Sequence, residues 1–109
     1  MFIARWHLTA NFGKLDDCVS LLKRWQIDVG ERIGWKVGSV RVTTGTVGAA
    51  PTAIEYEVHF DSLNDLESAW KDLEGVPHHR EYMKMFETVM APGSGTWTIR
   101  RQIDLAPND

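Results

Sequence analysis

The segment that decides the fold reads AIEYEVHFDSLNDLESAWKDLEG and spans residues 53–75. From Ala53 to Phe60 apolar and polar residues alternate strictly, which predicts a strand with one buried face. Ser62 then stands at a helix-capping position, and Asp65 follows it at capping-box spacing. After this cap the apolar residues recur with the helical period until a closing glycine. The segment therefore predicts a strand followed directly by an amphipathic helix.

Upstream of this segment the sequence predicts a strand, a long helix and a second strand. Residues 2–9 alternate between apolar and polar side chains, as a half-buried strand does. From Leu15 the apolar period becomes 3.6, which predicts a helix that ends at Gly34 or one turn earlier. Asn11 is its expected cap. Residues 35–46 alternate again, before a turn rich in glycine and proline.

Downstream, Pro77 fits the first turn of another helix, whose apolar side continues to Met90. Residues 96–103 predict the last strand, and a polar tail follows from about residue 104. Two strand–helix–strand units predict an α+β, ferredoxin-like β-α-β-β-α-β fold with a four-stranded antiparallel sheet, as a single domain over residues 1–109. We expect the first and third strands to be central, parallel neighbours and all four apolar faces to meet the helices.

Composition and charge exclude several partners. The formal net charge is −3 and the positive residues are scattered, so no basic run is available for a nucleic acid. The apolar runs fall far short of the roughly 18 residues that a membrane span requires. Arg5 interrupts the N-terminal apolar stretch, which argues against a signal peptide. Cys18, the single cysteine, lies on the apolar stripe of the first helix and suits a reducing compartment. We expect a cytoplasmic protein with a structural thiol.

The polar face of the predicted sheet carries many charged residues. Its members are Arg5, His7, Arg41, Glu55, Glu57, His59, Thr98 and Arg100. Ile3, Trp35 and Val37 are interleaved with them on the predicted strands. Such a face either meets solvent or packs against a second sheet with arginine against glutamate, and the pattern leaves both open. These residues are the candidate subunit interface.

Two histidines of this face, His7 and His59, are expected near the same ends of the two central strands. Together with Glu57 they could bind a divalent metal or form a proton-transfer pair. A hydrogen-bonded polar cluster at an interface is the interpretation that we favour, so no metal site is predicted.

Residues 60–70 and 77–82 carry a family resemblance. The first range contains Phe-x-Ser and Trp70, and the second begins Pro-His-His. These segments are similar to those of antibiotic-biosynthesis-monooxygenase-like proteins and, less closely, of NIPSNAP-like proteins, so the chain resembles the dimeric α+β barrel superfamily. The resemblance implies a homodimer in which two sheets pack face to face with the helices outside, and a small-molecule pocket between sheet and helices.

Mapped onto this chain, the resemblance implies a pocket between the sheet and the last helix. Its ligand-binding residues would be Trp6, Trp97, Met83 and Phe86, and its catalytic candidates would be His79 at the rim, Tyr82 and Tyr56. Such an apolar pocket with a few polar tips is typical of small-molecule sites. The alternative is that these aromatic rings simply fill the core.

Three functions remain open at this stage. The first is a cofactor-independent monooxygenase or cyclase-like enzyme that acts on an aromatic or polyketide-like substrate, and the second is a non-catalytic ligand-binding or sensing module. The third, a haem- or metal-binding protein, is disfavoured. His79 matches the haem-ligating position of the haem-degrading branch, but Trp6 replaces the asparagine of that branch. We therefore expect no cofactor.

Overall fold

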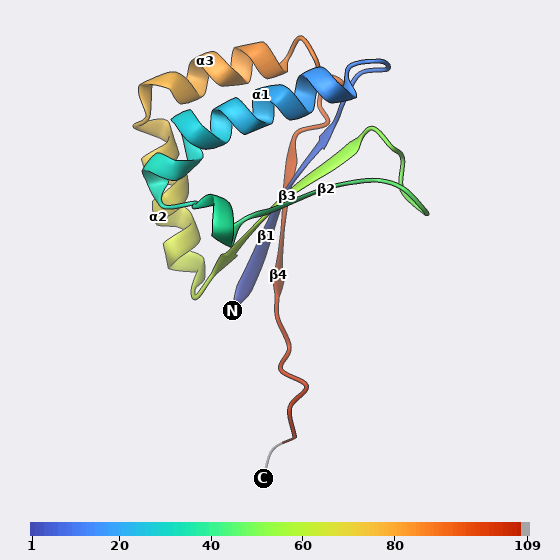
Figure 1. Ribbon diagram of the computed structural model, residues 1–109. Coiled ribbons are helices and arrows are strands. Elements are labelled where there is room, and N and C mark those ends of the chain that lie inside the picture. The colour runs from blue at the N-terminus through green and yellow to red at the C-terminus, as the bar shows by residue number, and fades with distance from the viewer. Residues whose placement is uncertain (108–109) are drawn as a thin grey trace.

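The computed structural model describes residues 1–107 and has the predicted order of elements (Figure 1). The strands and α-helices are β1 (Phe2–Thr9), α1 (Leu15–Asp28), β2 (Arg41–Thr44), β3 (Ala53–Phe60), α2 (Leu63–Glu74), α3 (Pro77–Phe86) and β4 (Thr96–Arg101). Two short 3-10 helices, η1 (Gly30–Ile33) and η2 (Val37–Ser39), connect α1 to β2. The α+β, ferredoxin-like fold is thereby confirmed.

The sheet has the strand order β2-β3-β1-β4, and every neighbouring pair is antiparallel. The prediction that β1 and β3 are central is confirmed, but the prediction that they are parallel is wrong. Each element from β1 through α1 and β2 to β3 reverses the direction of the chain, so β3 runs against β1. His7 consequently lies opposite Glu55, and His59 lies opposite Ile3 at the other end of the strands.

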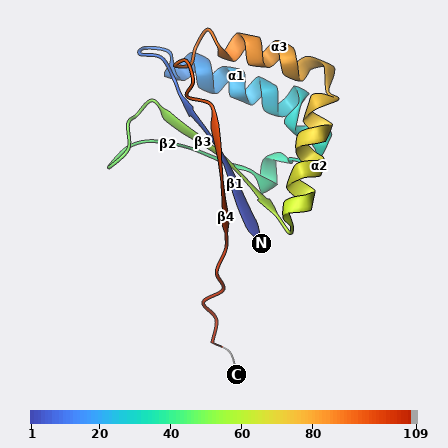
Figure 2. The ribbon, with the colours of Figure 1, turned by 180° about the vertical axis from the view of Figure 1, so that it is seen from behind.

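The helices form one layer on one side of the sheet, as the two opposite views show (Figures 1 and 2). The hydroxyl of Ser62 accepts a hydrogen bond from the backbone N–H of Asp65 at 3.1 Å, which confirms the predicted cap of α2. Pro77 begins α3 as predicted. The predicted cap of α1 is wrong, because Lys14 occupies the cap position and Asn11 contributes only its carbonyl, to the N–H of Lys14.

The second strand is shorter than predicted, because the chain after α1 first packs beneath the sheet. The backbone N–H of Trp35 donates to the carbonyl of Gly30 at 3.0 Å, and its carbonyl accepts from the Gln26 amide. Trp35 is therefore a core residue with 3% exposure. Val37 lies in η2 rather than in a strand. The placement of Trp35 and Val37 on the polar sheet face was wrong.

The last elements also end earlier than predicted. α3 ends at Phe86 instead of continuing to Met90, which forms an isolated bridge with Ala10. β4 ends at Arg101, and residues 102–107 run away from the rest of the molecule in both views (Figures 1 and 2). Within the described residues, no helix has both the length and the hydropathy needed to cross a membrane.

Candidate functional site

The aromatic residues of the predicted pocket pack against one another. Trp6 is 7% exposed, and its ring centroid lies 5.6 Å from that of Phe86 and 6.2 Å from that of Trp97. The rings of Trp25 and Tyr56 complete its surroundings at 5.6 and 6.4 Å. These separations are those of aromatic rings in direct contact. Packed rings thus occupy the place between the sheet and α3 where the cavity was expected.

The three predicted catalytic side chains all form hydrogen bonds with side chains in the last turn of α1. The pairs are Trp25 with His79, Gln26 with Tyr56, and Asp28 with Tyr82. His79 and Tyr82 belong to α3 and Tyr56 belongs to β3, so these bonds join three elements. The structure therefore brings the three candidates to one helix turn without bringing them into a common pocket.

His79 is held in a defined tautomer by its partner. The indole Nε1–H of Trp25 donates to Nδ1 of His79 at 3.1 Å, so the proton of the neutral ring resides on Nε2. Burial lowers the pKa of His79 below its ordinary value, which favours that neutral ring. His79 and Met83 line a cavity where α2 meets α3, together with Glu74 and Arg80.

Both tyrosines act as hydrogen-bond donors. Burial raises the pKa of Tyr56, and the charge of Glu31 raises it further, so its hydroxyl keeps the proton that it donates to Gln26. The hydrogen bond to Asp28 is the main cause that raises the pKa of Tyr82. Neither phenol is arranged as a base, and a catalytic role for either stays a prediction.

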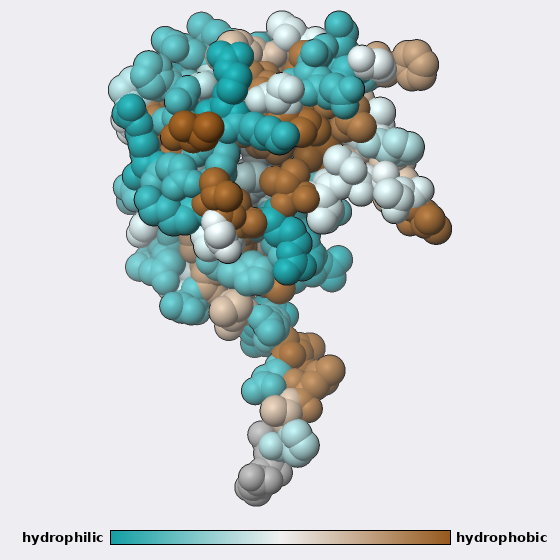
Figure 3. All heavy atoms as spheres, viewed as in Figure 1, coloured by the Kyte–Doolittle hydropathy of each residue, from teal (hydrophilic) through white to brown (hydrophobic). Residues whose placement is uncertain are grey.

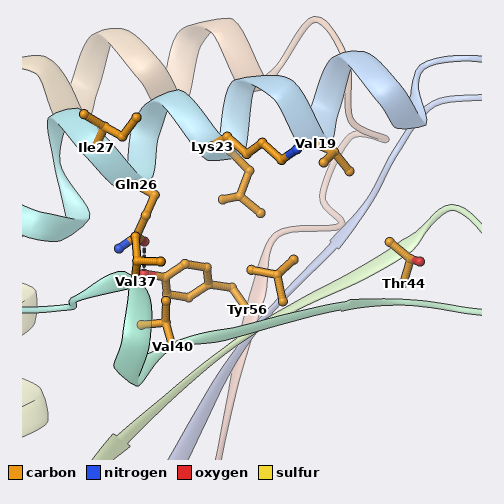
Figure 4. A pocket seen from close by; sticks show the side chains of 10 residues that line it. Val19, Lys23, Gln26, Ile27, Val37, Val40, Thr44 and Tyr56 are labelled. Carbon is orange, nitrogen blue, oxygen red and sulfur yellow. Dashed lines mark hydrogen bonds between the residues drawn. The ribbon is translucent and has the colours of Figure 1, made fainter.

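A cavity with an apolar wall lies elsewhere, between α1 and β2 (Figure 4). Its volume is about 600 Å³, within the range of small-molecule sites. Its apolar wall consists of Val19, Leu22 and Ile27 from α1 and of Val37, Val40 and Val42 from the segment that runs from η2 into β2. In the space-filling view, brown apolar side chains gather between these two elements (Figure 3). We call this cavity the α1–β2 cleft.

A few polar groups interrupt the apolar wall of the α1–β2 cleft. Tyr56 and Gln26 lie at its floor, where the phenol donates to the amide oxygen (Figure 4). Lys23 contributes the charged group of the lining, and Thr44 contributes a hydroxyl. Such a site can hold an apolar molecule, direct one polar group toward the floor and attract an anionic group to its rim.

Sequence reasoning placed only Tyr56 of this lining in a site. The available signal was Ile27, an apolar residue outside the stripe that packs α1 against the sheet, and it is 68% exposed. Val37 and Val42 are also more than a third exposed. Three exposed aliphatic side chains, one each from α1, η2 and β2, mark a surface that is suited to a ligand.

The polar sheet face carries a connected set of charged side chains. Arg5 donates through Nε to Oε1 of Glu57 at 3.0 Å, and Nε2 of His59 lies 3.0 Å from Oε2 of the same carboxylate. The hydrogen bond with His59 is the main cause that lowers the pKa of Glu57, and Arg5 lowers it further. His7 lies 3.5 Å from Glu55 instead, so the two histidines serve different carboxylates.

Comparisons with known proteins find likeness in structure alone. No family model matches the chain, and no curated protein matches it significantly. A NIPSNAP family protein of Agrobacterium tumefaciens superposes with a TM-score of 0.77 at 15% identity, covering 97% of this chain and 96% of that one. A NIPSNAP domain protein of Burkholderia xenovorans gives 0.72 at 10% identity, covering 99% and 100%.

A third similar structure comes from the other group of proteins that the chain was expected to resemble, the antibiotic-biosynthesis-monooxygenase-like proteins. A protein of Deinococcus radiodurans, provisionally assigned as an antibiotic biosynthesis monooxygenase, gives a TM-score of 0.61 at 12% identity and covers 100% of this chain and 99% of its own. At these identities the likeness establishes the fold and leaves function open. The chain therefore has the fold of NIPSNAP and antibiotic-biosynthesis-monooxygenase-like proteins, as its resemblance to the dimeric α+β barrel superfamily predicted.

Proposed function

We propose that this protein binds a small apolar molecule in the α1–β2 cleft and does so as a homodimer. The observation that carries this proposal is the cleft of about 600 Å³, whose wall is aliphatic and whose floor carries a buried pair of polar groups. Apolar walls supply affinity by excluding water, and a few fixed polar groups orient the ligand.

Binding without turnover is the form of this proposal that the lining residues favour. The polar groups of the cleft are a phenol, an amide, a hydroxyl and an ammonium, and the phenol of Tyr56 already donates to the amide of Gln26. Because burial raises the pKa of Tyr56, this phenol is a poor general base near neutral pH.

A cofactor-independent monooxygenase or cyclase-like enzyme is the alternative. It is favoured by the fold likeness to the Deinococcus radiodurans protein. In this alternative Tyr56 would donate its hydrogen bond to a polar group of the substrate, and His79 would act through Nε2–H rather than through a free lone pair. Repeated turnover of an aromatic substrate by the purified protein would select it.

The homodimer is proposed through the polar sheet face. Glu57 is only 13% exposed in its side chain, lies between Arg5 and His59, and faces Arg41 across the sheet. Because this face contains both signs of charge, a second copy related by a twofold axis can place arginine against glutamate. The buried single thiol of Cys18 supports the cytoplasm as the proposed compartment.

Titration with the neutral apolar dye Nile red tests the cleft. We expect one saturable site per chain, and Val42→Glu should weaken binding at least about tenfold because it places a carboxylate in the apolar wall. Val47→Glu is the matched control, since Val47 is 95% exposed in the β2–β3 loop outside the cleft. Equal binding by both variants would show that the dye binds elsewhere and would refute the proposal.

A further inference from the structure

The chain beyond β4 carries apolar side chains that hardly touch their own subunit. Ile103 is 74% exposed and Leu105 is 91% exposed. The backbone N–H of Gln102 donates to the carbonyl of Met1 at 2.9 Å, and residues 103–107 then extend past the start of β1 (Figures 1 and 2). Apolar residues that alternate on an extended segment are the pattern of a strand with one covered face.

This tail points away from the α1–β2 cleft of its own subunit (Figures 1 and 2). β4 and β2 are opposite edges of the sheet, three strand spacings or about 14 Å apart. β4 ends at the level of Phe2, whereas Val42 lies at the level of Trp6, about 13 Å farther along the strands. The two residues that lead from the end of β4 to Ile103 span at most about 7 Å.

The strand order brings the tail to a second copy instead. If two sheets stack through their polar faces about a twofold axis parallel to the strands, each β4 lies beside the β2 of the other subunit, because these strands are opposite edges. A rotation about such an axis keeps the direction of every strand. The end of β4 therefore approaches the η2 of the other subunit, which directly precedes its β2. Val37 in η2 is 65% exposed and lines the cleft.

We propose that residues 102–107 of each subunit dock on η2 and the start of β2 of a second copy and form a further wall of that copy's α1–β2 cleft. This proposal rests on the proposed homodimer. Ile103 and Leu105 would cover the aliphatic side chains that flank the cleft opening. The charges also match, since the tail carries Asp104 while Lys36 and Arg41 flank the docking surface. The free outer edge of β2 is suited to accept an extended segment through its backbone.

Chemical cross-linking between two single variants tests the placement. Val37→Cys protein is co-refolded with Ile103→Cys protein and treated with a short bismaleimide, and we expect a dimer-sized product on a denaturing gel. The matched control replaces Val37→Cys by Phe12→Cys, because Phe12 is fully exposed at the opposite end of the sheet. The Val37 mixture should give several-fold more product, and equal yields in the two mixtures would overturn the proposal.

Removal of the tail gives a second, independent measurement. A chain that ends at Arg101 should have a dimer dissociation constant raised about tenfold to a hundredfold, the effect of exposing one or two aliphatic side chains. It should also bind Nile red several-fold more weakly. A full chain that sediments as a monomer would refute both the homodimer and the docked tail. A dimer that is unaffected by the truncation and gives no specific cross-link would refute the tail alone.

Discussion

Replacing Tyr56 by Phe tests whether the floor of the α1–β2 cleft depends on its hydrogen bond. Tyr56 is fully buried and Gln26 is 8% exposed, so the pair is largely shielded from water. Stranding the amide oxygen of Gln26 should lower the free energy of unfolding by about 1–3 kcal/mol. A domain of this size changes its melting temperature by about 4–5 °C per kcal/mol, so we expect a decrease of about 4–15 °C.

A double-mutant cycle makes this prediction specific. Gln26→Leu keeps the side-chain volume but leaves both the Tyr56 hydroxyl and the carbonyl of Trp35 without a hydrogen-bond partner. It should therefore lower the free energy of unfolding more than Tyr56→Phe does. The double variant removes both members of the pair and leaves only the Trp35 carbonyl without its donor. Its cost should therefore be lower than the sum of the single costs by about 1–3 kcal/mol.

Urea unfolding at one fixed protein concentration, followed by tryptophan fluorescence, measures these differences. Ser62→Ala is the control partner, because the cap of α2 shares no contact with the Tyr56–Gln26 pair. Its cost should add to that of Tyr56→Phe within about 0.5 kcal/mol. Additivity of Tyr56→Phe and Gln26→Leu within the same margin would refute the argument that the two groups depend on each other.

Three further predictions concern charge and burial. Because burial lowers the pKa of His79, the unfolded chain binds a proton at a higher pH than the folded chain, so the free energy of unfolding should decline as the pH falls below about 6.5. In urea unfolding, His79→Gln should reduce this dependence on pH, and an unchanged dependence would contradict the prediction. Lys23→Met should weaken 2-naphthoic acid about two- to fivefold in Nile red displacement while leaving 2-naphthalenemethanol unchanged, and an equal loss for both would remove Lys23 from the binding of anionic groups. Glu57→Ala should raise the dimer dissociation constant at least about tenfold in sedimentation, relative to the exposed control Glu67→Ala, since it strands Arg5; equal values for the two variants would locate the interface elsewhere.

Local signals in the sequence were sufficient for most elements. The alternation from Ala53 to Phe60, the cap at Ser62 and the start at Pro77 each depend on residues within one turn or one strand, and all three are confirmed. The errors arose where distant contacts decide. Trp35 continues an alternating pattern, but its backbone bonds to the end of α1 withdraw it from the sheet.

The site was harder to predict than the fold because a cavity depends on how side chains from several elements fill a shared volume. Periodicity correctly placed Trp6 and Trp97 on the helix-facing side of the sheet. It could not tell that their rings would stack at 6.2 Å and fill the expected pocket. The α1–β2 cleft depends on exposed aliphatic residues such as Ile27, which look ordinary when each is considered alone.

The three bonds to the last turn of α1 also determine how the cleft can respond mechanically. Trp25, Gln26 and Asp28 tie this end of the helix to α3 and β3, whereas the other end packs through apolar side chains such as Cys18 and Leu22. If the cleft widens, α1 should rotate about its hydrogen-bonded end, because apolar contacts can shift without the loss of a hydrogen bond. Larger ligands should therefore tilt the start of α1 outward, and faster amide exchange near Val19 than near Trp25 would report that motion.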